Sequence, residues 1–420
     1  MTETETTATT VNADEVLAGL KIIDCDAHFT EPPDLWTSRA SDAWRDRVPV
    51  MRTEDGRSAW YLEGQLMCSI GGNTIEGEHE KRLGVLGVQP FDVVDRAAWD
   101  VDARLNLLDK MGVHAQILYP NAIGFASNTM FGIDDIEQRN EIQRIYNDYL
   151  VDLQRASNGR LFPQAVLPVW DMERTTKEME RLRDAGITGF TISDKPHLVG
   201  LPDLDAPYFE PMWALANEMG TVFNFHIGSG VGPNKADPRM AEMIKTGDPT
   251  SFPNPELYWE SFGPQRRLAI LATSFYMSNA RIIVNMCMSG MFDRYPNVKI
   301  ASAESGIGWI PFILEAMEYQ LDEMVTDPAE LAVQQRRPTE YFRDHFYAMF
   351  WFERVGPAKL IDAIGVHNVL VETDIPHPTC IYPGARERLA SAVAGLDPYV
   401  RRRVIQDNAS ELYGIPVPTD

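Results

Sequence analysis

Short β-branched or apolar runs alternate with longer segments of helical period from residue 21 onward, and this alternation is the feature that most constrains the fold. Strand followed by helix, repeated, is typical of parallel βαβ units, and eight such units close into a (β/α)8 TIM barrel. We therefore predict an α/β TIM barrel, with an open doubly wound sheet of fewer strands as the alternative. The predicted strands are residues 21–25, 114–118, 161–167, 186–192, 221–226, 298–303, 345–350 and 368–372.

Two long segments interrupt the alternation, residues 30–99 after the first predicted strand and 227–264 after the fifth. Both are rich in Gly, Pro and Asn. Loops that follow barrel strands lie on the catalytic face, so we expect these insertions to roof a substrate pocket. Residues 1–20 are predicted to be a flexible tail, and 21–420 a single domain. The predicted helices are residues 98–111, 135–153, 172–184, 208–218, 307–324, 356–364 and 385–394.

Carboxylates and imidazoles gather where four of the predicted strands end. Asp26 and His28 end the first strand, and alternation along a strand points both side chains the same way. The other ends carry His226, Glu304, Asp374 and His377. A single Asp after a strand is usually a helix cap or turn residue, and a single buried His is usually hydrogen-bonded core. Their coincidence at strand ends that converge on one mouth predicts a metal centre instead.

The charge balance and the cysteines limit the partners and the compartment. The chain has 38 Lys+Arg against 61 Asp+Glu, a formal charge of −23, which argues against nucleic acid and anionic membrane as partners. No apolar stretch approaches the roughly 20 residues of a membrane span. The N-terminus has no secretory signal pattern, and Cys25, Cys68, Cys287 and Cys380 show no paired spacing. We predict a cytoplasmic protein; its oligomeric state stays open, a homo-oligomer included.

Four motifs resemble the amidohydrolase-related metal-dependent barrels, a group that includes relatives of aminocarboxymuconate-semialdehyde decarboxylase. They are residues 23–36 (IDCDAHFTEPPDLW), 226–230 (HIGSG), 304–311 (ESGIGWIP) and 372–378 (ETDIPHP). The resemblance covers nearly the whole chain from residue 21. It implies a TIM barrel with a divalent metal at the C-terminal face.

Residue by residue, the resemblance matches Asp26 and His28 to the first-strand metal pair, His226 to the fifth-strand ligand and Asp374 to the eighth-strand carboxylate. His377 belongs to a DxPH signature of the group. Glu304 stands where decarboxylases and hydrolases of the group often place a histidine that works as acid or base. This departure argues against ordinary hydrolysis or decarboxylation.

The number and type of the predicted ligands limit which metal ions the site would bind. Six ligands (Asp26, His28, His226, Glu304, Asp374 and His377) exceed what one tetrahedral zinc uses, and they suit two ions or one six-coordinate ion. Hard carboxylates with imidazoles also suit iron. Glu304 would then bridge two irons.

The tracts 24–36 and 372–382 resemble a branch of these barrels that contains nonheme diiron monooxygenases of platensimycin and platencin diterpenoid biosynthesis. This second resemblance implies an iron-dependent monooxygenase of antibiotic biosynthesis, with Glu304 and Asp374 as catalytic residues. The enzyme would use O₂ and an electron donor. Its substrate would be an apolar, CoA-linked molecule of diterpenoid type.

Two other functions compete with this reading. In a mononuclear decarboxylase or hydrolase, one zinc or manganese would bind Asp26, His28, His226 and Asp374, and Glu304 would be the acid or base. A non-catalytic binding barrel is the third class, which the ligand types at the strand ends disfavour.

Further residues of the predicted loops and strands suggest substrate contacts and a lid. Aromatic and methionine side chains suggest an apolar mouth, and basic residues of the two long loops suggest contacts with CoA phosphates. His79 or Glu76 would reach over the barrel as a lid group. The apolar set is Phe125, Met130, Phe131, Phe346, Tyr347, Met349, Phe350, Trp351 and Phe352, and the basic set is Lys81, Arg82, Lys235, Arg239, Arg266 and Arg267.

Overall fold

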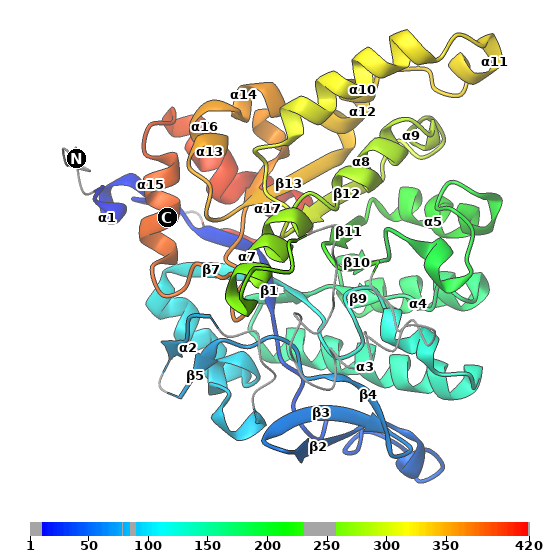
Figure 1. Ribbon diagram of the computed structural model, residues 1–420, viewed down its shortest axis with the longest axis vertical. Helices are drawn as coiled ribbons and strands as arrows, with labels where there is room; N and C mark the ends of the chain where they lie inside the picture. The colour runs from blue at the N-terminus through cyan, green and yellow to red at the C-terminus, as the bar shows by residue number, and fades with distance from the viewer. Residues whose placement is uncertain (1–10, 78, 85–89, 231–257, 419–420) are drawn as a thin grey trace.

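A parallel sheet forms the centre of the computed structural model, which describes residues 11–77, 79–84, 90–230 and 258–418. Among these residues the sheet has nine strands in the order β8-β7-β1-β14-β13-β12-β11-β10-β9, with helices outside them (Figure 1). The fold is therefore α/β, as predicted. The strands are β1 (Ile22–His28), β7 (Val113–Tyr119), β8 (Leu161–Pro163), β9 (Ala165–Val166), β10 (Gly189–Thr191), β11 (Val222–His226), β12 (Lys299–Ala303), β13 (Phe346–Phe350) and β14 (Val369–Val371).

Each of the eight predicted strands contains part of an observed strand of this sheet, with ends shifted by a few residues. The predicted strand 161–167 is divided at Gln164 into β8 and β9, which lie at the two ends of the strand order. β8 pairs with β7, and β9 pairs with β10. The first strand, β1, lies between β7 and β14, so the first and last strands of this sheet are neighbours within it.

The helices begin and end at recognisable caps. Asp135 accepts hydrogen bonds from the first-turn amides of α3, and Asp171 does the same for α4. Gly112 ends α2 in the left-handed conformation. In Figure 1, α10 and α11 project beyond the rest of the molecule. The helices are α1 (Ala13–Val16), α2 (Val101–Met111), α3 (Ile136–Ala156), α4 (Met172–Asp184), α5 (Glu210–Met219), α7 (Pro264–Phe275), α8 (Ala280–Cys287), α9 (Met291–Arg294), α10 (Ile310–Met324), α11 (Pro328–Leu331), α12 (Pro338–His345), α13 (Val355–Lys359), α14 (Ile361–Ile364), α15 (Ala385–Val393), α16 (Pro398–Arg402) and α17 (Asn408–Tyr413).

The segment between β1 and α2 holds regular structure that the sequence reading treated as loop. An antiparallel sheet joins β2 (Val50–Glu54), β3 (Arg57–Leu62) and β4 (Gln65–Ser69), and β5 (Ile75–Glu76) pairs with β6 (Glu80–Lys81). Both residues of the Asp55-Gly56 turn have positive φ, 50° and 75°. An Asp-Gly pair in that conformation is a strong hairpin signal, which was present in the sequence. Residues 231–257, most of the second predicted insertion, lie outside the described residues.

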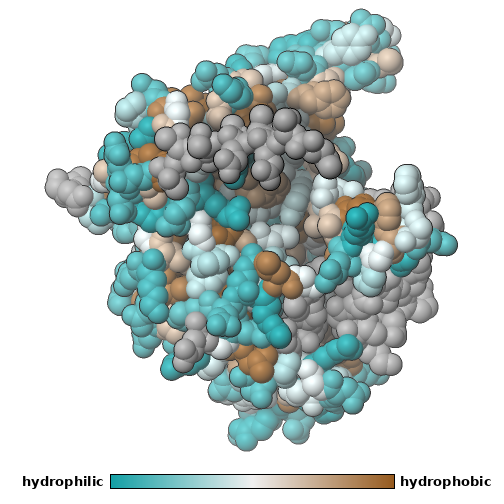
Figure 2. Space-filling view, turned by 60° about the vertical axis from the view of Figure 1, so that its left-hand side comes forward, coloured by the Kyte–Doolittle hydropathy of each residue, from teal (hydrophilic) through white to brown (hydrophobic). Residues whose placement is uncertain are grey.

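The polarity of the surface and the state of the cysteines can be compared with what the composition predicted. Figure 2 shows a face that is largely hydrophilic, with small hydrophobic areas and a hollow near its centre. No helix in the described ranges is long and apolar enough to cross a membrane. All four cysteines of the chain are described, and none forms a disulfide.

Candidate metal centre

The metal-ligating side chains predicted from the strand ends lie in the interior, at one end of the parallel sheet. Asp26 and His28 are the fifth and seventh residues of β1, and both are completely buried. His226 ends β11, Glu304 follows β12, and Asp374 follows β14. Since all these strands are parallel, their carboxyl ends meet at one edge.

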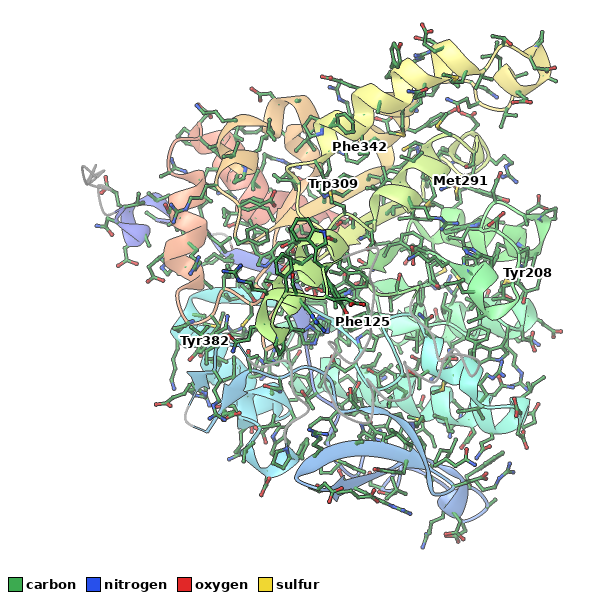
Figure 3. The ribbon with its side chains drawn as sticks, viewed as in Figure 1. Phe125, Tyr208, Met291, Trp309, Phe342 and Tyr382 are labelled. Atoms are coloured by element: carbon green, nitrogen blue, oxygen red, sulfur yellow. The ribbon has the colours of Figure 1, made fainter. Side chains whose placement is uncertain are left out.

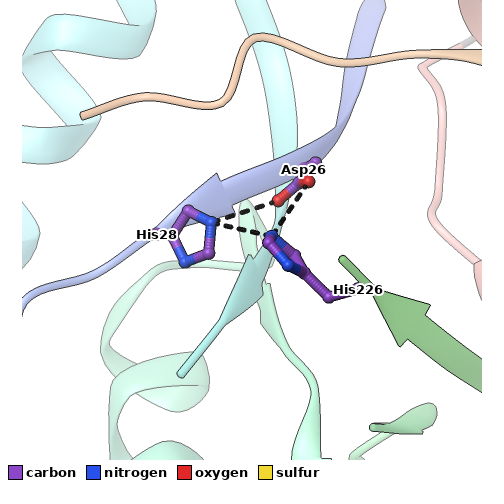
Figure 4. A group of neighbouring side chains, drawn as sticks. All are labelled: Asp26, His28 and His226. Carbon is purple, nitrogen blue, oxygen red and sulfur yellow. Dashed lines mark hydrogen bonds and ion pairs between the residues drawn. The ribbon is translucent and has the colours of Figure 1, made fainter. Parts of the chain in front are cut away.

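Asp26, His28 and His226 form the first donor group (Figure 4). The Nε2 atoms of the two imidazoles are 3.1 Å apart. Asp26 Oδ1 lies 3.5 Å from His28 Nε2, and its Oδ2 lies 3.4 Å from His226 Nε2.

A second group shares His28 and adds Asp374 and His377. Asp374 Oδ1 lies 3.6 Å from His28 Nε2 and 3.2 Å from His377 Nδ1. Glu304 Oε2 lies 3.4 Å from His226 Nε2. The six residues predicted from the sequence are therefore brought together, in one continuous cluster.

The spacing of these donor atoms fits ligands around a common ion. Metal–nitrogen and metal–oxygen bonds of about 2.0–2.2 Å place neighbouring ligand atoms about 2.8–3.6 Å apart at octahedral or tetrahedral angles. The distances in the cluster, 3.1 to 3.6 Å, lie in this range. The Nε2 atoms of His28 and His226 face each other beside the Asp26 carboxylate, and this arrangement would let all three bind one ion.

Several oxygens of the cluster are buried without a hydrogen-bond partner. They include both carboxylate oxygens of Asp26 and Oδ1 of Asp374. Burying a carboxylate with neither hydrogen bonds nor a counterion is very costly, so such groups coordinate metals or are paired. The unsatisfied oxygens therefore fit a cation.

Asp24, on the same strand, shows the contrast. Its two oxygens accept hydrogen bonds from the Thr373 amide (2.7 Å), the Thr373 hydroxyl (2.5 Å) and Gln116 Nε2 (2.7 Å). Gln116 in turn accepts from the buried Arg104 guanidinium at 2.9 Å. Asp24 thus has its partners within the protein, whereas Asp26 does not.

Burial and mutual repulsion make the cluster hard to ionise in the absence of a cation. Burial, with the charge of Asp374 next, raises the pKa of Asp26 and that of Glu304 well above their usual values. Burial also raises the pKa of Glu372 strongly, with Asp26 as the next cause. The pKa of His28 is held well below its usual value, first by burial and then by His377 and His226. A bound cation would favour the carboxylate anions and the neutral imidazole.

Two of the cluster residues have left-handed backbone. Glu304 has φ 50° and Asp374 has φ 59°, a conformation that costs a non-glycine residue about 1–3 kcal/mol. The Glu304 amide donates to Glu372 Oε2 at 3.0 Å, and the Asp374 amide donates to the carbonyl of Asp26 at 2.8 Å. These bonds hold both carboxylates in the cluster.

The sequence reading missed Thr379 and Asn121. The Thr379 hydroxyl lies between two carboxylates of the cluster. It is very close to Asp374 Oδ2 and lies 3.2 Å from Glu304 Oε1. Asn121 Oδ1 lies 3.0 Å from His377 Nε2. Threonine and asparagine are not among the residue types from which the metal site was predicted. Their role becomes visible only when the fold places them beside the cluster.

The predicted apolar mouth is only partly correct. Phe125 lies beside the cluster, with ring centroids 4.1 Å from His226 and 5.2 Å from His28 (Figure 3). The aromatic strand β13 is buried instead: Phe346, Met349 and Phe350 are core residues. Strands of a parallel sheet are covered on both faces, which explains why both faces of β13 are apolar.

The predicted lid residues have partners of their own. His79 Nδ1 lies 2.8 Å from Asp95 Oδ2, and Glu76 forms an ion pair with Arg82 at 3.0 Å. Lys81 Nζ donates to the carbonyl of Cys380, and Arg267 Nε donates to that of Phe262. Of the other predicted CoA anchors, Arg266 is exposed, and Lys235 and Arg239 lie outside the described residues.

Comparison with known proteins places the chain in a family. The model of a family described as amidohydrolase matches residues 23–415, which include all six cluster residues. The chain belongs to the amidohydrolase family. This confirms the broad resemblance that the four motifs implied.

Two relatives are decarboxylases. The chain is 26% identical over 283 residues to gamma-resorcylate decarboxylase of Polaromonas sp. strain JS666, covering 66% of this chain and 76% of that one. It is 22% identical over 329 residues to 2-amino-3-carboxymuconate-6-semialdehyde decarboxylase of Dictyostelium discoideum, covering 77% and 79%.

Solved structures share the fold. An amidohydrolase of Mycobacterium avium subsp. paratuberculosis K-10 superposes with a TM-score of 0.67 at 17% identity, covering 95% of this chain and 99% of that one. A dihydroxybenzoic acid decarboxylase of Polaromonas sp. JS666, with bound manganese and the inhibitor 2-nitroresorcinol, gives 0.59 at 18% identity, covering 94% and 97%.

These findings correct the predicted chemistry. A diiron monooxygenase of diterpenoid antibiotic biosynthesis is wrong, because the relatives are decarboxylases and a related structure holds manganese rather than two irons. The predicted requirements for O₂, an electron donor and a CoA-linked apolar substrate are wrong for the same reason. Glu304 in place of the usual histidine misled the prediction, since a carboxylate also serves as an acid or base.

Proposed function

We propose that this protein is a metal-dependent decarboxylase that removes CO₂ from a small aromatic carboxylate without oxidation. The observation that carries the proposal is the cluster in which Asp26, His28 and His226 form one donor group and His28 and Asp374 belong to a second, with carboxylate oxygens that lack hydrogen bonds. The decarboxylase relatives support the reaction class.

The four ligands would hold one divalent ion, manganese or zinc, at the carboxyl ends of β1, β11 and β14. Carboxylate and imidazole ligands together suit Mn²⁺, and imidazole also suits Zn²⁺. The bound ion supplies a Lewis acid that holds the substrate's carboxylate or a neighbouring hydroxyl oxygen. Phe125, beside the two imidazoles, offers an apolar surface for an aromatic ring.

Glu304 would be the general acid. Burial raises the pKa of its carboxyl well above the usual value, and the Thr379 hydroxyl lies within hydrogen-bond distance of its Oε1. In the reaction, the ring carbon that bears the carboxylate takes a proton, and its bond to the carboxylate carbon breaks. The electron pair of that bond stays on the ring, and CO₂ leaves. Positioned proton transfer of this kind contributes about 10²–10⁴ in rate.

We also infer that the sheet closes into an eight-stranded barrel formed by a single domain of residues 21–420. β8 and β9, the two end strands, are separated along the chain by Gln164 alone. If β8 and β9 are counted as one strand, the sheet has eight strands. That strand pairs with β7 on one side and with β10 on the other, which closes the sheet. The family match over 23–415 supports one domain. The flexible tail and the cytoplasmic location stay predictions.

The test is CO₂ release by the Mn²⁺-loaded protein under strict anaerobiosis, with 2,6-dihydroxybenzoate and 5-carboxyvanillate as probes. In D₂O the product is expected to carry one deuterium at the carbon that lost CO₂. His226→Ala, which removes a ligand, is the matched control and is expected to release none. Hydrolysis of ester or amide analogues without CO₂ release from any carboxylate would replace the decarboxylase with a hydrolase.

A further inference from the structure

The ring of His377 is oriented by a residue that the proposed reaction does not use. His377 stacks on His28 with ring centroids 3.5 Å apart, and its two nitrogens face different partners. Nδ1 lies 3.2 Å from Asp374 Oδ1, inside the cluster. Nε2 lies 3.0 Å from Oδ1 of Asn121, outside it.

The hydrogen bonds of Asn121 decide which nitrogen of His377 carries the proton. Asn121 Nδ2 donates to the carbonyl oxygen of Phe29 at 3.3 Å. A carbonyl oxygen only accepts, so the amide cannot turn round without losing this bond. Its Oδ1 must therefore face His377 and accept a hydrogen bond from Nε2–H. In the neutral ring Nδ1 is then unprotonated, with its lone pair beside the Asp374 carboxylate.

Asn121 is itself held from two sides. Glu31 Oε1, fully buried, accepts hydrogen bonds from the amides of Asn121 and Ala122, both at 3.0 Å. The Tyr146 hydroxyl donates to the same oxygen at 3.0 Å. On the other side a Cβ at Gly71 would lie 3.0 Å from the Asn121 side chain, so a larger residue there would crowd the amide.

A lone pair that faces a carboxylate oxygen at 3.2 Å is repulsive unless a cation lies near both. Fixing the second nitrogen of a ligating histidine is the usual task of groups behind a metal site, where their loss costs about 10–100-fold in affinity. We propose that Asn121 is a positioning residue that directs Nδ1 of His377 to the metal, with Glu31 holding Asn121 in place. This inference rests on the metal site of the proposed function and adds His377 to its four ligands.

The test measures Mn²⁺ affinity rather than activity. Metal-free protein is titrated with Mn²⁺, and the unbound ion is quantified by its electron paramagnetic resonance signal. Asn121→Leu keeps the size and removes the acceptor, so its Kd for Mn²⁺ is expected to rise about 10–100-fold. Asn121→Asp restores an acceptor and is expected to bind about tenfold more tightly than Asn121→Leu.

Asn408→Leu is the matched control. Asn408 is also buried, and its Nδ2 donates to the carbonyls of Val366 and Val369, at the start of β14 and so at the opposite end from Asp374. It makes the same chemical change and is expected to leave the Kd unchanged. A Kd for Asn121→Leu within twofold of the parent would overturn the inference and leave the proposed function standing. Failure of the parent protein to bind Mn²⁺ would overturn both.

A second measurement covers the case in which Asn121→Leu does not fold. Nitrogen-15 spectra of the Zn²⁺-loaded parent report which nitrogen of each histidine carries the proton, and His377→Gln identifies the signals of His377. We expect the proton on Nε2. A proton on Nδ1 would contradict the proposed role of Asn121.

Discussion

Asp24 and Asp26 show how two identical side chains on one strand face acquire different roles. Both are fully buried and lie two residues apart on β1. Asp24 is saturated by donors from Thr373 and Gln116, and Asp26 has none for either oxygen. A hydrogen-bonded carboxylate contributes to the fold, and an unsatisfied one is available to a cation.

This difference predicts opposite outcomes for the same substitution. Asp26→Asn is expected to lose the metal and remain folded, because it removes a ligand charge and no hydrogen bond to the carboxylate. Asp24→Asn is expected to keep the metal and change stability, because its partners are protein groups. Metal analysis and thermal unfolding of both variants measure these outcomes. Equal metal content in the two variants would contradict the assignment of Asp26 as a ligand.

For Glu304, the proposed acid role predicts retention of the ion. Glu304→Gln keeps the size of the side chain but holds no transferable carboxyl proton, so the rate of CO₂ release should fall about 10²–10⁴-fold. Metal content should remain at the parent level, since four other ligands hold the ion. Loss of the ion from Glu304→Gln would make Glu304 a ligand instead.

The sequence indicated the six cluster residues because the end of a strand is a position in sequence as well as in space. Thr379 and Asn121 could not be found this way. Asn121 lies 256 residues from His377 along the chain, and an asparagine after a strand is ordinarily a turn residue. The reaction was also out of reach, because carboxylates and imidazoles bind several metals and each metal supports several chemistries.

At the scale of elements, the loop from β12 to α10 depends on Glu353. Its carboxylate accepts from the amides of Ile307 (3.0 Å) and Gly308 (2.8 Å), at the turn that follows Glu304. A Cβ at Gly306, where φ is 69°, would lie 3.0 Å from Glu353 Oε2. The ESGIGW motif thus needs its first glycine for both backbone conformation and space.

Gly306→Ala is therefore expected to cost more than a left-handed alanine alone. Gly56→Ala is the matched control, because Gly56 has φ 75° and nothing within 4 Å of an added Cβ. The control should cost about 1–2 kcal/mol in the free energy of unfolding. Gly306→Ala should cost more than the control, and displacement of Glu304 by about 1 Å should lower the rate about 10²-fold.

Urea unfolding and initial rates measure both effects. Equal losses in the two variants would show that Glu353 gives way without moving Glu304.

The elements themselves were predicted to different degrees. Strands such as β11 and β13 are rich in aromatic and other apolar residues, and α4 matches its predicted bounds, residues 172–184. The hairpins of β2 to β4 were missed because β2 is largely exposed and β4 is only half-buried, although β3 between them has three buried residues. Their turn residues carried the signal instead.

At the scale of the whole molecule, Asp24 links stability to pH. Burial raises its pKa from 3.8 to about 6. The folded protein therefore binds this proton more tightly than the unfolded chain. The contribution is fully present below pH of about 4, and it is lost as pH rises through about 6. A shift of this size corresponds to about 3 kcal/mol.

Comparison of the metal-free parent with metal-free Asp24→Asn isolates this contribution. The variant should gain about 3 kcal/mol relative to the parent between pH 4 and 8. Its lost hydrogen bonds add an offset that does not vary with pH. Urea unfolding at several pH values measures the difference, and a difference independent of pH would show that Asp24 titrates normally.

The position of β1 between β7 and β14 has a consequence for protein synthesis. The first ligands, Asp26 and His28, leave the ribosome early, whereas Asp374 and His377 come about 349 residues later. At about 5–20 residues per second this interval lasts about 17–70 s. Throughout it β1 has no β14 beside it, and the ligand set is incomplete. If the proposed ligands hold the ion, a chain interrupted before residue 369 lacks Asp374 and is expected to bind it more weakly than the finished chain.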